Sequence, residues 1–259
     1  MLLVIDVGNT NVTLGLYRGE TLAHHWRIAT DHERTSDEYA MLFLALFAHA
    51  GCNPKAVTGL ALASVVPPLT GVIAAVSRDY FGLDPLIVDA GVKTGVKVRY
   101  DNPREVGADR VADAAAAYQL YGGPACIVDF GTGTTFDAIS ATGDYLGGAI
   151  APGIGVAAEA LFQRTAKLPR VSIARPPSAI GTNSVHSLQS GLLFGYVGLV
   201  EGMVARFKRE LGEGTKVIGT GGLAELVAAE TEVIQILDPW LTLKGLRIIY
   251  ELNREPIRV

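Results

Sequence analysis

The chain has 259 residues, of which 49% are hydrophobic and 19% are charged, and its formal net charge is −4. This composition is typical of a compact globular protein, and the lack of any run of Lys or Arg argues against nucleic acid as a partner. Cys52 and Cys126 stand among apolar residues, which predicts free thiols in a reducing compartment. Asp6 interrupts the first apolar run and no basic segment precedes it, so we expect a cytoplasmic protein without a signal peptide or a membrane partner.

The chain opens on an apolar strand that ends in a polar turn. The turn Asp6-Val7-Gly8-Asn9-Thr10-Asn11 follows Leu2 to Ile5, and a second strand with alternating apolar residues continues to Tyr17. Glycine and hydroxyl residues in such a turn direct N–H and O–H donors toward one point, which suits phosphate oxygens. The alternative is a β-hairpin in which these residues only form the turn.

Strands and helices alternate in the rest of the first half. Thr35-Ser36-Asp37-Glu38 is a capping box that predicts the start of a helix. Strands are expected over 21–28, 60–66 and 85–88, and helices over 39–49 and 70–81. Such alternation predicts an α/β fold.

An alanine-rich helix follows a polar stretch. Asn102 and Pro103 supply the N-cap and the first-turn proline of a helix that we expect to continue to Tyr121. Asp109 on this helix has small neighbours, and an enzyme that phosphorylates a hydroxyl group needs one aspartate to accept or orient its proton. The alternative is a solvated helix aspartate. We place the domain boundary at Gly122-Gly123-Pro124, which gives domains 1–121 and 122–259.

The second half begins with a copy of the opening motif. Ile127 and Val128 lead into Asp129-Phe130-Gly131-Thr132, in which Asp129 follows Asp6 by 123 residues. A carboxylate at a phosphate-binding turn repels phosphate unless a cation lies between them, so Asp129 implies a metal or ammonium-type ion. Two such hairpins predict two related domains that face each other across a phosphate.

The remaining elements include a long helix with regularly spaced glycines. Strands are expected over 126–128, 135–140, 145–150, 217–219 and 233–237, and helices up to 162, from 183 to about 211, and over 240–253. Gly191, Gly195, Gly198 and Gly202 share one face of the long helix, and each costs about 1 kcal/mol of helix stability relative to Ala. A closely approaching backbone would offset this cost. It could come from the alanine-rich helix of the same chain or from the same helix in a second subunit.

One motif points to a different class of protein. Gly219-Thr220-Gly221-Gly222-Leu223-Ala224 fits the dinucleotide-binding pattern, and Asp238 lies near the position of its acidic residue. Only 35 residues follow Ala224, however, which is too few for the remaining strands of such a domain. Asp238 before Pro239 is better explained as a helix cap.

Several stretches together resemble the type III pantothenate kinase family. They are 6–11, 101–110, 129–132 and 219–222, and the likeness continues through Asn183 and over 238–245. The resemblance implies an α/β fold with two ribonuclease-H-like (actin-like ATPase) domains and an interdomain nucleotide cleft. It also implies ATP-dependent phosphorylation of pantothenate to 4'-phosphopantothenate, the first step of coenzyme A biosynthesis.

The same resemblance assigns the residues of the site. Asp109 would be the proton acceptor, and Asp129 would bind potassium or ammonium, with Mg²⁺ accompanying ATP. The residues that would bind ATP are Asp6, Val7, Gly8, Asn9, Thr10, Asn11, Val12, Thr13 and Thr132. Those that would bind pantothenate are Tyr100, Gly107, Ala108, Asp109, Arg110 and Ser184, the last standing where the family usually has threonine. A homodimer with the pantothenate pocket at its interface is also implied.

Two other functions are compatible with these motifs. A non-catalytic nucleotide-binding regulator can have this fold, and so can a kinase that acts on a sugar. Asp109 together with both Asp-x-Gly turns favours a kinase, and phosphorylation assays with a panel of hydroxyl substrates would separate the three.

Overall fold

The computed structural model describes residues 1–254, which form two compact units. Unit 1 contains residues 1–97, 101–116 and the described residues from Thr242 onward, and unit 2 contains Val98–Tyr100 and Ala117–Leu241. This division differs from domains 1–121 and 122–259, because the C-terminal helix packs within unit 1. Residues 255–259 of the expected second domain lie outside the described residues.

Unit 1 is built on a five-stranded sheet in the order β3-β2-β1-β4-β5. Its strands are β1 (Leu2–Val7), β2 (Asn11–Arg18), β3 (Thr21–Ala29), β4 (Gly59–Ser64) and β5 (Leu86–Ile87). The first three strands are antiparallel neighbours, whereas β4 and β5 are parallel to β1. This is the strand order of the ribonuclease-H-like fold, as the sequence predicted.

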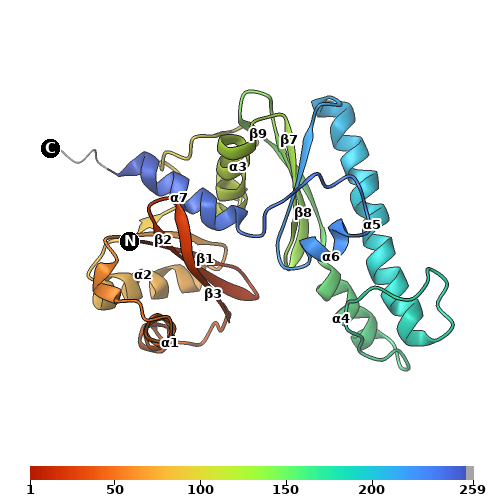
Figure 1. The fold of residues 1–259 in the computed structure, drawn as a ribbon, viewed down its shortest axis with the longest axis horizontal. Helices are drawn as coiled ribbons and strands as arrows, with labels where there is room; N and C mark the ends of the chain where they lie inside the picture. Colours follow the sequence, from red (N-terminus) through yellow and green to blue (C-terminus); the bar gives the residue numbers. More distant parts are fainter. Residues whose placement is uncertain (255–259) are drawn as a thin grey trace. The chain divides into compact units, whose positions relative to one another are not determined.

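Helices cover both faces of this sheet (Figure 1). The helices α1 (Ser36–His49) and α2 (Pro67–Phe81) share one core with β1, β2 and β4. On the other face, Leu243 of α7 (Leu241–Asn253) packs on Gly15. Tyr250 of the same helix lies so close to Gly59 that a Cβ there would overlap its hydroxyl. Gly245 brings α7 against the backbone of α3 (Ala108–Tyr121) in the same way.

The helix starts follow the predicted caps, with two differences. Thr35 and Glu38 form the expected capping box of α1. The pair Pro67-Pro68 starts α2 rather than only ending a strand, because the first helical turn needs no proline N–H. Asn102 caps a short 3₁₀ turn (Pro103–Glu105), and α3 begins separately at Ala108. The expected continuous helix is therefore wrong, since extended Val106 intervenes.

Unit 2 repeats this topology. Its sheet has the order β11-β10-β7-β8-β9-β6, so that β7, β8 and β9 correspond to β1, β2 and β3, with β10 and β11 parallel to β7. The strands are β6 (Lys97–Val98), β7 (Ala125–Phe130), β8 (Gly133–Ile139), β9 (Asp144–Pro152), β10 (Lys216–Thr220) and β11 (Ile236–Leu237). The predicted duplication of a strand–Asp-x-Gly–strand unit is confirmed at the level of whole sheets.

One long helix covers a face of this second sheet. The helices of unit 2 are α4 (Ile154–Arg164), α5 (Ser184–Leu211) and α6 (Ala224–Ala228). By length and composition α5 could cross a membrane. Leu193, Val197, Val200 and Val204 of α5 are buried in a core with β7, β8 and β10, so one face of the helix packs on this sheet.

Candidate active site

The polar turn of unit 1 is rigidly closed. The amide of Gly8 donates to the Asn11 carbonyl (2.9 Å), and Thr30 Oγ1 donates to the Gly8 carbonyl (2.6 Å). Val7 and Val12 on either side are fully buried, whereas the two residues at the tip of the turn, Asn9 and Thr10, are exposed. The donors of the predicted ATP-binding turn therefore point away from the core on a fixed backbone.

The first turn of α3 lies beside the carboxyl end of β1. The amide of Val65, just after β4, donates to the Val7 carbonyl (3.0 Å). A Cβ on Gly107 would lie 3.1 Å from Val65 Cγ1, so the start of α3 packs against the same residue. Unit 1 thereby brings Gly107–Arg110 to the edge of the sheet that carries the Asp6 turn, which is where α/β sheets bind ligands.

Asp109 lies in the first turn of α3 with its carboxylate close to Gly107. A Cβ at residue 107 would overlap Asp109 Oδ1, so Gly107 leaves room for the carboxylate in this orientation. The Arg110 amide donates to the same oxygen (2.7 Å). Burial raises the pKa of Asp109, while the amide and the charge of Arg110 act in the opposite direction. A desolvated carboxylate with a raised pKa is suited to accept a proton from a substrate hydroxyl.

The corresponding turn of unit 2 offers oxygen ligands. A Cβ on Gly131 would lie 3.5 Å from Asp129 Oδ2 and 3.5 Å from the Gly133 carbonyl oxygen. The amide of Gly153 donates to the Thr132 carbonyl (3.0 Å) and fixes the loop. A carboxylate and a backbone carbonyl thus approach one point at which residue 131 has no side chain. This donor set fits a hard monovalent cation such as K⁺, which takes oxygen ligands.

Gly221 supports the same carboxylate from the neighbouring strand. Its φ is +90°, and a Cβ there would overlap Asp129 Oδ1 and stand 2.7 Å from the Phe130 amide nitrogen. Both features require glycine. The glycines after β10 therefore serve the packing of Asp129, which accounts for them without a dinucleotide-binding domain.

Asp238 has a structural role that excludes the ribose-binding one. It is almost fully buried, accepts from the Tyr121 hydroxyl (2.7 Å) and from the Trp240 amide (3.2 Å), and lies just before α7. Burial and the bond to Asp238 raise the pKa of Tyr121 to about 12. Asp238 thus stabilises the turn that leads into α7.

Tyr100 is held by unit 2 rather than by the residues that follow it in the chain. The amide of Arg99 donates to the Tyr145 carbonyl (2.8 Å), and Arg99 Nε lies 2.8 Å from Asp144 Oδ2. The ring of Tyr100 lies over Gly147, where a Cβ would stand 3.4 Å from it. Tyr100 is thus fixed on β9.

Ser184 is the first residue of α5. Asn183 caps this helix, because its Oδ1 accepts from the His186 amide (2.9 Å). The helix has 28 residues, and a rise of about 1.5 Å per residue makes it about 40 Å long.

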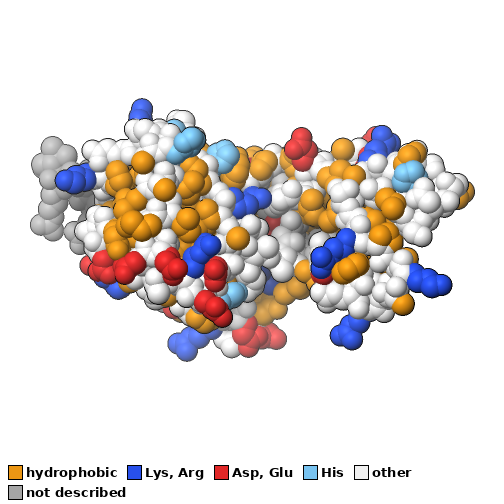
Figure 2. Space-filling view, turned by 90° about the horizontal axis from the view of Figure 1, so that it is seen from below, with side chains coloured by type: hydrophobic (Ala, Val, Ile, Leu, Met, Phe, Trp, Pro, Cys, Tyr) orange, Lys and Arg blue, Asp and Glu red, His pale blue; other side chains and the backbone are white. Residues whose placement is uncertain are grey.

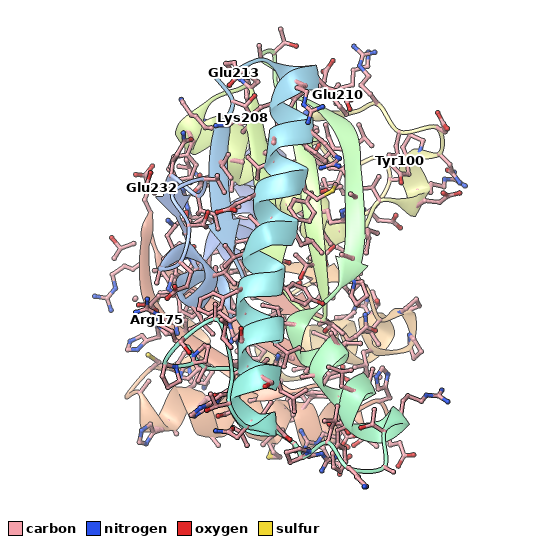
Figure 3. The ribbon with its side chains drawn as sticks, turned by 90° about the vertical axis from the view of Figure 1, so that its right-hand side faces the viewer. Tyr100, Arg175, Lys208, Glu210, Glu213 and Glu232 are labelled. Atoms are coloured by element: carbon pink, nitrogen blue, oxygen red, sulfur yellow. The ribbon has the colours of Figure 1, made fainter. Side chains whose placement is uncertain are left out.

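Tyr100 lies toward the opposite end of α5. Phe207, near the helix C-terminus, packs against Phe136 of β8 with ring centroids 6.1 Å apart, and β8 pairs with the part of β9 that carries Gly147. In Figure 3, Tyr100 lies nearer to the end of α5 that carries Lys208 and Glu210 than to the other end. Within one chain, Tyr100 and Ser184 therefore do not share a pocket.

Comparison with known proteins identifies the family. A family model described as type III pantothenate kinase matches residues 2–206. The chain belongs to the type III pantothenate kinase family. The type III pantothenate kinase of Roseiflexus castenholzii is 54% identical to it, over 98% of this chain and 100% of that protein. The kinase of the same name from Moorella thermoacetica is 53% identical over the same shares.

Solved structures agree with the fold. A conserved Campylobacter jejuni protein described as a Baf family transcriptional activator has a TM-score of 0.62 at 19% identity, covering 97% of this chain and 98% of its own. Component A of the (R)-2-hydroxyglutaryl-CoA dehydratase of Acidaminococcus fermentans has a TM-score of 0.53 at 14% identity, with coverages of 98% and 99%. At these identities the likeness concerns architecture alone.

The site residues expected for a type III pantothenate kinase are divided between the two units. Unit 1 holds the turn 6–13 and 107–110, while unit 2 holds Tyr100, Asp129, Thr132 and Ser184. Sequence reasoning missed the glycine at residue 153, which closes the 131–133 loop, and a buried group around Asp137. A charged residue inside the otherwise apolar strand Phe136–Ile139 was the available signal for the latter.

Proposed function

We propose that this chain transfers the γ-phosphoryl group of ATP to the primary hydroxyl of pantothenate, with Asp109 as the proton acceptor. As a member of its family, the chain is a kinase that phosphorylates pantothenate in coenzyme A biosynthesis. The observation that carries the residue assignment is the pair of Asp-x-Gly turns on equivalent strands of two like sheets. A desolvated aspartate stands beside the first of them.

The two turns would bind ATP through fixed donors. The backbone around Gly8 is closed by hydrogen bonds and needs little reorganisation on binding, which favours phosphoryl transfer by positioning. Asp129 and the Gly133 carbonyl would hold the monovalent cation. When bound, K⁺ or NH₄⁺ at Asp129 and Mg²⁺ on ATP neutralise phosphate charge.

Asp109 would act on the acceptor hydroxyl. Its carboxylate is kept in place by the Arg110 amide and the close approach to Gly107, so that its orientation does not depend on the substrate. Arg110 supplies positive charge next to it and suits the carboxylate of pantothenate.

A panel of hydroxyl substrates tests this function. Steady-state phosphorylation of pantothenate, several sugars and glycerol would be measured with ATP, in potassium and in sodium buffers. Turnover of pantothenate alone supports the proposal. Preferred turnover of a sugar, or nucleotide binding without turnover of any acceptor, would contradict it.

We infer that the working enzyme is a homodimer whose pantothenate pocket uses two chains. The separation of Tyr100 and Ser184 along α5 supports this, because one small substrate can contact both only if the second residue comes from the partner subunit. Gly191, Gly195 and Gly198 have no heavy atom of the described chain within 4 Å of an added Cβ. This face is thus not used for packing on the alanine-rich helix and is open to a second copy.

Subunit mixing tests the shared pocket. Tyr100→Ala and Ser184→Ala homodimers should both bind pantothenate poorly. Because one pocket of a mixed dimer combines two intact residues, co-refolding the variants should restore about a quarter of wild-type activity. Mixtures that stay as inactive as the separate variants would show that both residues serve the same subunit.

Gly195→Leu tests the glycine face. A leucine has open space in the single chain and a better helix propensity than glycine, so the subunit should fold, but as a monomer with weakened pantothenate binding. Light scattering after size exclusion measures this. Gly71→Leu on α2, another open helical glycine, is the matched control and should remain dimeric. A dimeric, fully active Gly195→Leu enzyme would refute the role of this face.

We also propose a cytoplasmic location with neither nucleic acid nor membrane as a partner. The net charge of −4 supports this, and Figure 2 shows Lys and Arg scattered over the visible face rather than gathered into a patch. Cys52 and Cys126 are free thiols, which suits a reducing compartment.

A further inference from the structure

Unit 2 contains a buried carboxylate that the proposed reaction does not use. Asp137 on β8 has no exposed surface. Its Oδ2 accepts a hydrogen bond from Thr135 Oγ1 (3.0 Å), and its Oδ1 accepts one from the Tyr145 hydroxyl (2.8 Å). Thr135 is in turn the cross-strand partner of Asp129.

Burying this group is costly. A carboxylate loses its hydration in the interior, and interactions with neighbouring groups rarely offset more than part of the loss. Apolar residues of similar size at positions 137 and 145 would pack the same sheet without that cost. The pair is therefore better explained by the geometry that it imposes than by the stability that it adds.

The geometry imposed is that of the ring of Tyr145. Its hydroxyl is tied to Asp137 and its carbonyl accepts from the Arg99 amide, so both ends of the residue are fixed. The ring lies next to that of Tyr100, with centroids 6.4 Å apart and planes inclined at 48°. Gly147, with φ +123°, lies under the ring of Tyr100, and a Cβ there would stand 3.4 Å from it.

We propose that Asp137 and Tyr145 are positioning residues that hold the ring of Tyr100 in place for the acceptor substrate. This rests on the proposed function, in which Tyr100 contacts pantothenate. The hydrogen bond holds the ring of Tyr145, and Tyr145 and Gly147 both lie against the ring of Tyr100. The acceptor substrate then contacts a ring that is already ordered, which lowers the entropy cost of binding.

A double-mutant cycle tests this proposal. Tyr145→Phe removes only the hydroxyl, and it should raise the KM for pantothenate about threefold to tenfold, because the ring of Tyr100 is then less well ordered before the substrate binds. The KM for ATP should not change. In a Tyr100→Ala background the same substitution should have almost no further effect on the KM for pantothenate, because the ring that it positions is gone. A merely structural role would instead give additive effects.

The controls separate this proposal from the function on which it rests. Tyr39→Phe, which deletes a buried tyrosine hydroxyl in unit 1, should leave the KM for pantothenate at the wild-type value. If Tyr100→Ala raises that KM but Tyr145→Phe does not, the positioning role is overturned and the kinase function stands. A wild-type enzyme that does not phosphorylate pantothenate would overturn both.

A second variant covers the case in which Tyr145→Phe does not fold. Asp137→Asn keeps the shape of the side chain and one acceptor oxygen, but it weakens both hydroxyl contacts. It should raise the KM for pantothenate in the same direction and again be non-additive with Tyr100→Ala. The melting temperatures of the wild-type protein and the variant would be compared as well. If the effects of Asp137→Asn and Tyr100→Ala on the KM are additive, Asp137 has only a structural role.

Discussion

Asp109→Asn is expected to lower kcat by about 10²–10⁴-fold while the KM for ATP changes little. The amide keeps the shape of the carboxylate and the contact with the Arg110 amide, but it cannot accept the proton of the substrate hydroxyl. Steady-state kinetics with pantothenate as the varied substrate measure the loss. Asp79→Asn on the surface of α2 is the matched control and should retain wild-type rates.

The raised pKa of Asp109 leads to a further expectation, which concerns the stability of the Asp109→Asn variant. Because burial raises that pKa, the ionised carboxylate is the form that the fold disfavours. The stability that Asp109 contributes is present at acidic pH and is lost as the pH rises through the raised pKa. Asp109→Asn should therefore melt at or above the wild-type temperature at neutral pH. A variant that is both inactive and strongly destabilised would point to a structural role instead.

The symmetric part of this molecule could be predicted from sequence because it follows local rules. An apolar strand, Asp-x-Gly and an alternating strand specify each hairpin, and the repeat of Asp6 at Asp129 specifies that there are two. The helix caps at Thr35 and Asn183 follow from side-chain chemistry within four residues.

The parts that could not be predicted depend on contacts between residues that are distant in sequence. Nothing near Gly153 or Gly221 shows that each packs on a loop of another strand. The packing of α7 in unit 1 depends on glycines such as Gly245, which let the helix approach closely. The distance between Tyr100 and Ser184 depends on the direction of α5. Motifs predicted the residues of the site, and only the fold shows which of these predicted residues lie near one another in one chain.

Activation by potassium should disappear in Asp129→Ala, with turnover about 10²-fold below the potassium-activated wild type. The carboxylate lies next to Gly131 and Gly221, at the turn that would hold phosphate. Without neutralisation it would repel ATP, and without the carboxylate the site loses its charged ligand. Initial rates in potassium, ammonium and sodium chloride at constant ionic strength measure the response.

The response should also be visible without turnover. Potassium should raise the melting temperature of the wild-type protein in the presence of ATP, because a ligand that binds the folded state stabilises it. Asp129→Ala should show no such shift, whereas Asp84→Ala, which removes an exposed carboxylate paired with Arg78, should show the full one. Equal rates of the wild-type enzyme in sodium and potassium would contradict the proposal that a bound potassium ion neutralises Asp129.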